Sequence, residues 1–216
     1  MRRHWVWFFV LLIAGVALWA SLAASANGPV SSKLTAAELQ KVIKGDVVLK
    51  NVINEQTHQG YGSGFCVFHG TTDQFWSVIF DYDHYLDIYP RLKKVTLISH
   101  VGNVYTAAFV MDASLTTLHY TTINTLADDK LRMSWVTDMT QPHKYFKRND
   151  GYWQLEEISP GVLIGEYHVE VELDLGLFTG LVTKIVRSMS KEDLPDVMTS
   201  TRKRMESGGT WKRPGR

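Results

Sequence analysis

The stretch Val162–Leu173, which reads VLIGEYHVEVEL, decides the fold. Apolar and polar residues alternate along it, so a strand here would have two unlike faces: Tyr167, Val169, Val171 and Leu173 on one, and Glu166, His168, Glu170, Glu172 and Asp174 on the other. One apolar and one polar face are typical of an antiparallel sheet that is covered on one side and wet on the other. The sequence therefore predicts such a sheet, with its last strand at 162–173.

The same period of two extends back along the chain to residue 95. It is interrupted at turn signals such as Gly102-Asn103, Ala127–Lys130 and Ser159-Pro160-Gly161. Strands are expected at 47–52, 61–68, 95–101, 104–111, 115–126, 131–136, 145–158 and 162–173. Three pairs of these strands flank the turn signals, 95–101 with 104–111, 115–126 with 131–136 and 145–158 with 162–173, which indicates antiparallel neighbours.

Helices are expected at both ends of this strand series. A short amphipathic helix is predicted over 34–43, a capped helix over 71–80, and one more helical turn over 83–88. The long C-terminal helix, 178–205, carries an apolar stripe, with a kink or break at Pro195 and with Ser190 as a candidate cap for its second half. Only this helix is long enough to cover the apolar face of the sheet. The expected fold class is α+β: a helix-grip fold, in which a curved antiparallel sheet wraps around the long C-terminal helix.

The N-terminus has the composition of a bacterial signal peptide. Arg2 and Arg3 precede an apolar run, and Ala24-Ser25-Ala26 supplies an A-x-A cleavage site. The alternative is an uncleaved anchor helix, because the apolar run is long enough to cross a bilayer. The expected organisation is a signal peptide at 1–26, a linker and short helix at 27–44, a ligand-binding domain at 45–206 and a flexible tail at 207–216. The expected location is outside the cytoplasm, in the periplasm.

The charge balance argues against a nucleic-acid partner. Removing residues 1–26 takes away two arginines and no acid, so 23 basic and 22 acidic residues become 21 and 22, a net charge of −1. A nucleic-acid-binding surface would need a basic stripe. Cys66 is the only cysteine, so an intramolecular disulfide is impossible. Its apolar neighbours predict a buried, unreactive thiol.

Three segments resemble a known superfamily. They are FWSVIFDYDHY at 75–85 with PRLKKV at 90–95, GYWQL at 151–155 followed by Pro160-Gly161 and Tyr167, and the terminal helix with Leu194-Pro195 and the basic residues 202–204. Together they resemble the polyketide cyclase / coenzyme Q-binding branch of the START-like (Bet v 1-like, SRPBCC) superfamily, over about 45–206. Leu86 departs from the pattern, which often has a second proline there. The resemblance implies a helix-grip fold with an apolar ligand cavity, and it leaves open lipid carriers, quinone-binding proteins, aromatase/cyclases and hydroxylase subunits.

No catalytic or metal-binding motif accompanies this pattern. The eight histidines are scattered, and the HExxH, GxSxG and nucleotide-binding glycine patterns do not occur. We expect no cofactor and no metal. His119 and Tyr120 are neighbours on a strand, so one of the two points inward.

The remaining signal is a set of aromatic residues on the predicted inward faces. They include Trp76 and Tyr105. The expected ligand site combines Phe109, Trp135, Trp153 and Tyr167 with Leu181, Ile185 and Met189 of the C-terminal helix. Aromatic side chains with polar tips suit a pocket for an apolar ligand that has one polar end. The entrance is expected near segments 83–90 and 112–114.

Three functions remain open at this point. The first is an exported, non-catalytic binder or carrier of a hydrophobic small molecule: a lipid, an isoprenoid or a quinone. The second is a cyclase/aromatase-like enzyme that acts on a polycyclic or polyketide-like substrate. The third is a module that contacts the membrane surface through Lys184, Arg187 and the basic run at 202–204.

Overall fold

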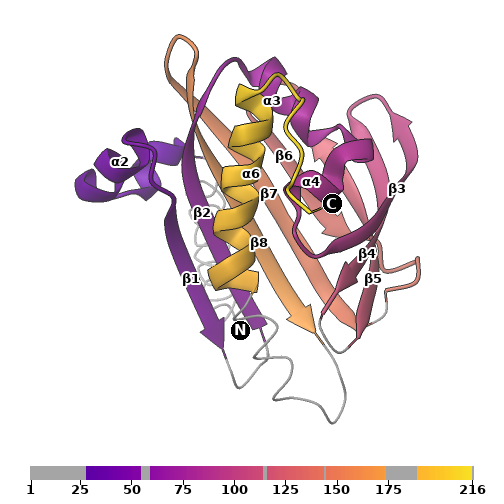
Figure 1. Ribbon diagram of the computed structural model, residues 1–216. Helices are drawn as coiled ribbons and strands as arrows, with labels where there is room; N and C mark the ends of the chain where they lie inside the picture. The colour runs from indigo at the N-terminus through magenta and orange to yellow at the C-terminus, as the bar shows by residue number, and fades with distance from the viewer. Residues whose placement is uncertain (1–27, 55–58, 114–115, 144, 174–188, 216) are drawn as a thin grey trace, which may run out of the picture.

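The computed structural model describes residues 28–54, 59–113, 116–143, 145–173 and 189–215. One antiparallel sheet of eight strands, in the order β1-β2-β8-β7-β6-β5-β4-β3, forms the body of the molecule (Figure 1). Its strands are β1 (Val48–Asn54), β2 (Gln59–His69), β3 (Leu92–Val101), β4 (Val104–Asp112), β5 (Thr117–Leu126), β6 (Arg132–Thr137), β7 (Phe146–Ser159) and β8 (Val162–Leu173). The expected strands are all present.

Helix α6 (Leu194–Glu206) crosses the inner face of the sheet in front of β2 and β8, and the sheet curves around it (Figure 1). Helix α3 (Thr72–Ile79), the short 3-10 turn η2 (Tyr82–His84) and helix α4 (Tyr85–Ile88) lie beside α6 on the same face. The molecule is thus an α+β helix-grip fold, which confirms the predicted fold class.

The predicted helix at 178–205 is interrupted near Pro195. A π-helical turn at Met189–Asp193 precedes α6, and Pro195 occupies the first turn of α6, where a missing N–H breaks no helical hydrogen bond. Asp193, rather than the expected Ser190, holds the N-cap position. Residues 178–188 lie outside the described residues.

A glycine in β2 allows α6 to lie close to the sheet. A Cβ at Gly64 would be 3.0 Å from Met198 Cγ and 3.1 Å from Leu194 Cδ2, which is tighter than ordinary van der Waals contact. A larger residue there would require the side chains of Leu194 and Met198 to shift. The sequence of β2 therefore sets the separation between the helix and the sheet.

The inner face carries an aromatic core at the end of the sheet next to α3. Trp153 is fully buried, with ring centroids 5.2 Å from Phe75 and 6.3 Å from Phe68, in edge-to-face contacts. Val197 and Met198 of α6 close this cluster from the helix side. This cluster fixes one end of the helix against the sheet.

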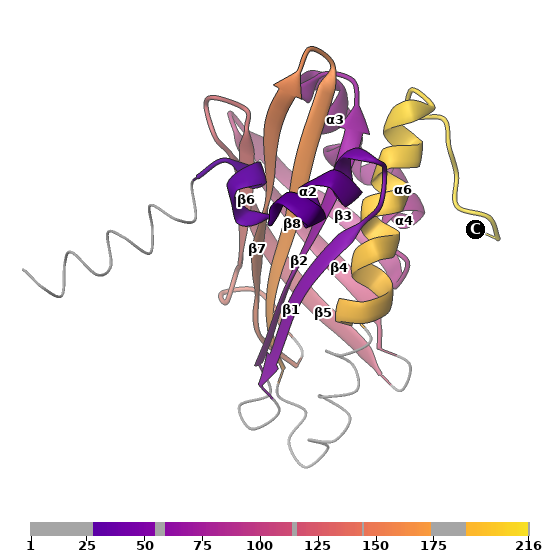
Figure 2. The same cartoon turned by 90° about the vertical axis from the view of Figure 1, so that its left-hand side faces the viewer.

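Part of the outer face is covered rather than wet. The 3-10 turn η1 (Val30–Lys33) and helix α2 (Ala36–Ile43) lie on the side of the sheet opposite to α6 (Figure 2). Glu166 was expected to face water, but it is 2% exposed, because Lys33 covers it and forms an ion pair of 2.7 Å. Ser63 donates a second hydrogen bond to the Glu166 carboxylate, at 2.8 Å. The prediction that this face of the strand is exposed to water is therefore wrong at Glu166.

The segment after α6 lies against the domain, unlike the flexible tail that the sequence suggested. The Arg213 guanidinium donates to the Asp196 carboxylate at 2.7 Å, to the Ile88 carbonyl at 2.9 Å and to the Ser200 hydroxyl at 2.9 Å. These bonds fasten the C-terminal segment to α4 and α6, beside which it runs in Figure 1.

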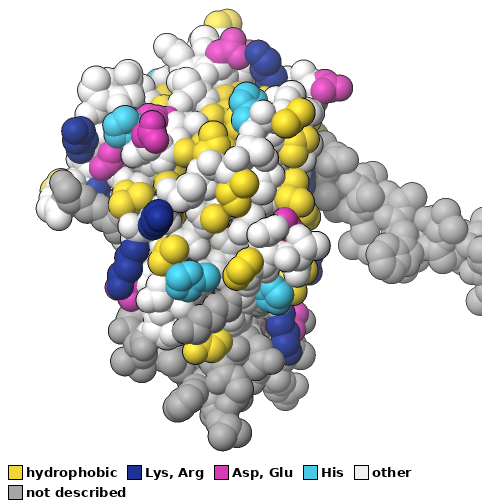
Figure 3. Space-filling view, turned by 90° about the vertical axis from the view of Figure 1, so that its right-hand side faces the viewer, with side chains coloured by type: hydrophobic (Ala, Val, Ile, Leu, Met, Phe, Trp, Pro, Cys, Tyr) yellow, Lys and Arg dark blue, Asp and Glu magenta, His cyan; other side chains and the backbone are white. Residues whose placement is uncertain are grey.

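The edge strand β3 is the most exposed part of the sheet. Figure 3 shows this side of the molecule, with apolar side chains spread among polar atoms and histidines. Leu97, Ile98 and Val101 are exposed on β3, the last of them by 75%. Within the described part of the chain, no helix is both long and apolar enough to cross a membrane.

Candidate functional site

A cavity of about 100 Å³ lies between α6, α4 and the concave face of the sheet. Its lining comprises Tyr85, Tyr89, Pro90, Arg91, Leu92, Phe109, Met111, Tyr120, Thr122, Asn124, Met133, Trp135, Asn149, Tyr167, Val169, Asp193, Leu194 and Val197. The strand residues in this set recur at every second position, because alternate side chains of a strand point to the same face. The cavity is therefore built mainly by the inward stripes of five adjacent strands, β4 to β8.

Most of the wall is apolar. Phe109 and Met111 come from β4, Met133 from β6 and Val169 from β8, while α6 contributes Leu194 and Val197 from above. The Trp135 ring stacks on Tyr167, with centroids 5.4 Å apart. Such a wall can bury an apolar molecule but gives it few directional contacts.

The position of Trp135 depends on a glycine in the neighbouring strand. Trp135 is the register partner of Gly151, and its indole lies over that residue. A Cβ at 151 would overlap both this ring and the backbone carbonyl of His168. Gly151 therefore creates the space in which Trp135 forms part of the cavity wall.

Four tyrosines line the cavity with uncharged hydroxyls. Burial raises the pKa of Tyr89 to about 12 and raises those of Tyr85, Tyr120 and Tyr167 above the ordinary value. Trp153 Nε1 lies 3.5 Å from the Tyr89 hydroxyl, and hydrogen bonds from Trp153, Tyr85 and Tyr167 offset only part of the effect of burial on the pKa of Tyr89. At neutral pH these phenols act as hydrogen-bonding groups and not as charges.

Three uncharged polar residues, Thr122, Asn124 and Asn149, form a patch on the sheet side of the cavity, which we call the polar wall. All three are buried. Asn124 Nδ2 donates to the Tyr105 carbonyl at 3.0 Å and to Thr122 Oγ1 at 2.9 Å. The Asn149 side chain hydrogen-bonds to the Tyr120 hydroxyl. The polar wall is thus held in a fixed orientation by its own hydrogen bonds.

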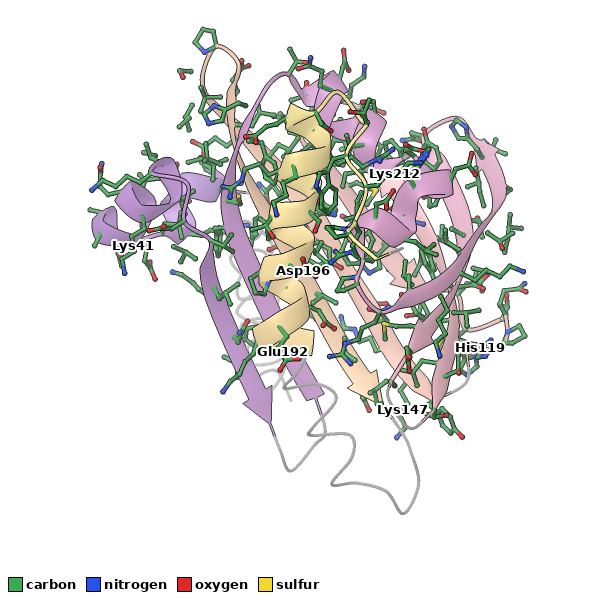
Figure 4. All side chains as sticks on the ribbon, in the orientation of Figure 1. Lys41, His119, Lys147, Glu192, Asp196 and Lys212 are labelled. Atoms are coloured by element: carbon green, nitrogen blue, oxygen red, sulfur yellow. The ribbon has the colours of Figure 1, made fainter. Side chains whose placement is uncertain are left out.

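An ion pair stands at the helix side of the cavity. Arg91 Nε donates to Asp193 Oδ2, and the Arg91 guanidinium also lies 3.5 Å from Glu192. Figure 4 shows Glu192 in the turn that leads into α6, with Asp196 further along the helix. Burial raises the pKa of Asp193, and the attraction of Arg91 offsets part of this rise. The pair joins the start of α6 to the segment before β3.

Three of the predicted site residues come together in this cavity. Phe109, Trp135 and Tyr167 line it. Trp153 does not, because α3 and Phe68 enclose it in the aromatic core behind Tyr167. Leu181 and Ile185 lie outside the described residues, and of Met189 only the backbone is described. That any of these residues binds a ligand stays a prediction.

The expected entrance segments differ in their relation to the cavity. Tyr85, Tyr89 and Pro90 of segment 83–90 line it. Ala113 is buried in the core and is not part of the lining, and residue 114 lies outside the described residues. The cavity therefore borders only the first of the two segments.

Two candidate residues of the sequence lie away from the cavity. His119 is exposed, and Figure 4 shows it on the outer side of β5, while its neighbour Tyr120 points inward. Cys66 is buried, and burial raises the pKa of its thiol to about 11, so the thiol stays protonated. In the described part of the chain, no group of His, Cys, Asp or Glu side chains has the arrangement of a metal site.

The basic run at 202–204 does not form the surface patch that was expected for membrane contact. Arg204 is 2% exposed and pairs with Asp81 at 2.7 Å, and Arg202 donates to the Gly45 carbonyl at 2.8 Å. Only Lys203 of the three lies at the surface, near the Trp211 ring. Lys184 and Arg187 lie outside the described residues.

A family model described as polyketide cyclase / dehydrase and lipid transport matches residues 71–201, more than half of the chain. The protein belongs to this family. The curated proteins include no match to the sequence. The family membership and the fold confirm the resemblance to the START/Bet v 1 (SRPBCC) superfamily, whose members include both lipid transfer proteins and aromatase/cyclases.

Solved structures with the same fold come from distant relatives. The STAR-related lipid transfer protein of Xanthomonas axonopodis is similar with a TM-score of 0.59 and 11% identity, over 74% of this chain and 93% of that one. The Zhui aromatase/cyclase of a Streptomyces species has a TM-score of 0.56 and 14% identity, over 75% and 99%. Human STARD10 has a TM-score of 0.58 and 10% identity, over 74% and 71%. At these identities the similarity establishes the fold alone, a fold that accommodates both binding and catalysis.

Proposed function

We propose that the protein is an exported binder or carrier of a hydrophobic small molecule, which it holds in the cavity between α6 and the sheet. The observation that carries this proposal is the polar wall inside a cavity whose lining is mostly apolar and aromatic. A wall of Phe109, Met133, Trp135 and Val169 with one fixed polar patch fits an apolar molecule that has one polar end. A lipid, an isoprenoid or a quinone has this character.

The size of the cavity means that a long ligand must displace side chains as it enters. The volume of about 100 Å³ is below the roughly 300–1,000 Å³ that drug-sized ligands occupy. Burial of ten CH₂ groups contributes about 8 kcal/mol. Immobilising a ligand costs about 4–15 kcal/mol, so a short chain would bind weakly. The π-helical turn at 189–193 borders the cavity through Asp193, and π-helical turns are frequent at functional sites.

Binding without chemistry fits the lining better than catalysis does. A general acid or base works best with a pKa near the operating pH. The pKa values of the four tyrosines are raised, and the carboxyl of Asp193 is engaged by Arg91. No histidine, lysine or cysteine is among the described lining residues. A cyclase-like enzyme is the alternative that the family keeps open.

Export is the part of the proposal that rests on the N-terminal sequence. A cleavage after Ala26 would leave Asn27 as the first residue. The chain is already anchored at the next residue, because the Gly28 carbonyl accepts a hydrogen bond of 2.9 Å from Gln154, and Val30 is fully buried. A mature chain that begins at Asn27 would therefore keep every anchoring contact of this segment.

Mass spectrometry of the exported protein tests this proposal. The full chain is produced in a Gram-negative host, and the periplasmic fraction is purified and analysed intact and under native conditions. We expect a mass that begins at Asn27 and a co-purified apolar molecule. Val169→Trp, which would fill most of the cavity, should lose the ligand. Val136→Trp, on the exposed face of β6, should retain it.

Several outcomes would contradict parts of the proposal. A membrane-bound species that retains Met1 would reject cleavage. A wild-type protein that carries no apolar molecule from the host and takes none from a lipid and quinone extract would reject the carrier function. A thermal melt shows whether Val169→Trp is folded, and a smaller filling variant, Val169→Phe, repeats the comparison if it is not.

A further inference from the structure

The charges around the cavity cancel one another. Arg91 and Asp193 are the only residues of opposite full charge in the described lining, and they form an ion pair with each other. Glu192 lies 3.5 Å from the Arg91 guanidinium and adds a second negative charge. The remaining polar groups of the lining are hydroxyls and amides. A ligand anion would therefore meet no cation that is not already opposed by a carboxylate.

A buried anion without a counter-charge is costly. Transfer of an ionised group out of water carries a penalty of several kcal/mol even after the protein relaxes. A hydroxyl group costs much less, and one good hydrogen bond compensates for most of it. Tyrosine hydroxyls are neutral at neutral pH, so the four tyrosines add hydrogen-bonding groups to the lining without adding charge.

The polar wall offers a hydrogen-bond acceptor. Asn124 Nδ2 uses its hydrogens on the Tyr105 carbonyl and Thr122 Oγ1, which fixes the orientation of the amide. Asn124 Oδ1 accepts from the Thr122 hydroxyl at 3.2 Å. An amide oxygen has two lone pairs, so one more donor can bind there. A hydroxyl can donate to this oxygen, whereas a carboxylate can only accept.

We infer that the cavity selects an uncharged apolar molecule that carries a hydroxyl group, and that it excludes the corresponding carboxylate. This inference rests on the proposed function, since it names the class of ligand for the same cavity. Thr122 and Asn124 are the residues that determine the preference for a hydroxyl group. The Arg91–Asp193 pair contributes because the Asp193 carboxylate compensates for the charge of the arginine.

Three probes with one apolar chain and different heads test the inference. Farnesol, farnesoic acid and farnesylamine are titrated into the mature protein at pH 7.5, by calorimetry and by tryptophan fluorescence, since Trp135 lines the cavity. Farnesol should bind at least about tenfold more tightly than the acid or the amine. Asn124→Leu and Thr122→Val should each weaken farnesol binding about five- to tenfold. The matched control Thr125→Val, on the exposed face of β5, should leave it unchanged.

A variant that should bind the carboxylate more tightly completes the test. Asp193→Asn removes a carboxylate that opposes the charge of Arg91, so it should tighten the binding of farnesoic acid relative to that of farnesol. Acid or amine binding equal to or tighter than alcohol binding by the wild-type protein would overturn the inference and leave the proposed function standing. Binding of none of the three probes by a protein that takes an apolar molecule from the lipid and quinone extract would overturn the inference alone, and binding of neither the probes nor any molecule of the extract would overturn the proposed function as well.

Discussion

Individual glycines determine where the aromatic side chains of this protein can lie. The sheet is packed with large rings, and a ring can lie flat on a neighbouring strand only where that strand has no Cβ. Gly151 has this role for Trp135, which is half of the stacked pair with Tyr167 in the cavity wall. A single hydrogen-sized side chain in β7 thus supports a large side chain of β6.

Gly151→Ala should destabilise the protein by about 3 kcal/mol, because the added methyl overlaps both a backbone carbonyl and the Trp135 ring. The control is Gly102→Ala, in an open turn with a φ of +59° and nothing within 4 Å of the added Cβ. The control should lose only about 1 kcal/mol from backbone strain. Urea denaturation measures both variants. A loss at 151 no greater than the loss at 102 would show that Trp135 does not depend on this glycine.

The positions of individual side chains were harder to predict from the sequence than the fold was. The alternation in 162–173 correctly placed Tyr167, Val169, Val171 and Leu173 on the inner face. It could not show that Trp153 lies in the core and not in the cavity, because that depends on how α3 packs against the sheet. It also missed Thr122, Asn124 and Asn149, since small polar residues on an inward stripe give no signal until their neighbours are known.

At the scale of elements, α6 is fastened to the loops beside it by buried charge. Arg204 lies 2.7 Å from Asp81 and 3.5 Å from Asp87, and it also donates to the Trp211 carbonyl at 2.7 Å. Loss of Arg204 would leave the largely buried Asp87 without this contact, whereas the side chain of Asp81 is 30% exposed and keeps His84 at 2.9 Å. The basic run 202–204 therefore has a mainly structural role.

Arg204→Met should lower the free energy of unfolding by about 2–3 kcal/mol at pH 7, because it removes charged hydrogen bonds to a partly exposed Asp81 and to the Trp211 carbonyl, and Lys203→Met, at the surface, should cost much less. Burial raises the pKa of Asp81, but hydrogen bonds and charges of His84 and Arg204 outweigh it and leave the pKa below 3.8. The folded state thus binds this proton less readily than the unfolded state, so the contribution is complete above about pH 3.8 and is lost as the pH falls further.

Urea denaturation of both variants and the wild type, at pH 7 and then stepwise down to pH 3, measures this. The difference between wild type and Arg204→Met should narrow below pH 3.8. Equal losses for the two variants at pH 7, or a difference that does not change with pH, would contradict the role of the Arg204–Asp81 pair.

The sequence predicted where helices and strands begin and end more accurately than it predicted which residues of those elements are buried. Turn signals and capping residues placed the strands and α3 within a few residues, because these are local effects. The burial of Glu166 was not foreseen, since it depends on η1, which is more than 130 residues away in the chain and packs on the outer face through Lys33 and Ser31. The anchored segment at 207–215 was missed for the same reason: Arg213 reaches Asp87 and Asp196 on other elements.

At the scale of the whole molecule, the fold holds one long helix against a wide concave sheet. The aromatic core around Trp153 fills one end of this space, and the tyrosine-lined cavity remains at the other. The side chains of the described helices α3, α4 and α6 leave this part of the concave face unfilled. The proposed binding site is therefore the part of the concave face that the helices leave unfilled, and the polar wall determines which ligands this cavity can bind.

Methionine methyl NMR tests the binding of an apolar ligand in this cavity most directly, because the chain carries methionines inside and outside it. Met111 and Met133 line the cavity, whereas Met139 is half exposed on the outer surface. With ¹³C-methyl-labelled methionine and added farnesol, the signals of Met111 and Met133 should shift and saturate, while that of Met139 stays in place. Saturable shifts at Met139 with none at Met111 and Met133 would contradict binding in the cavity.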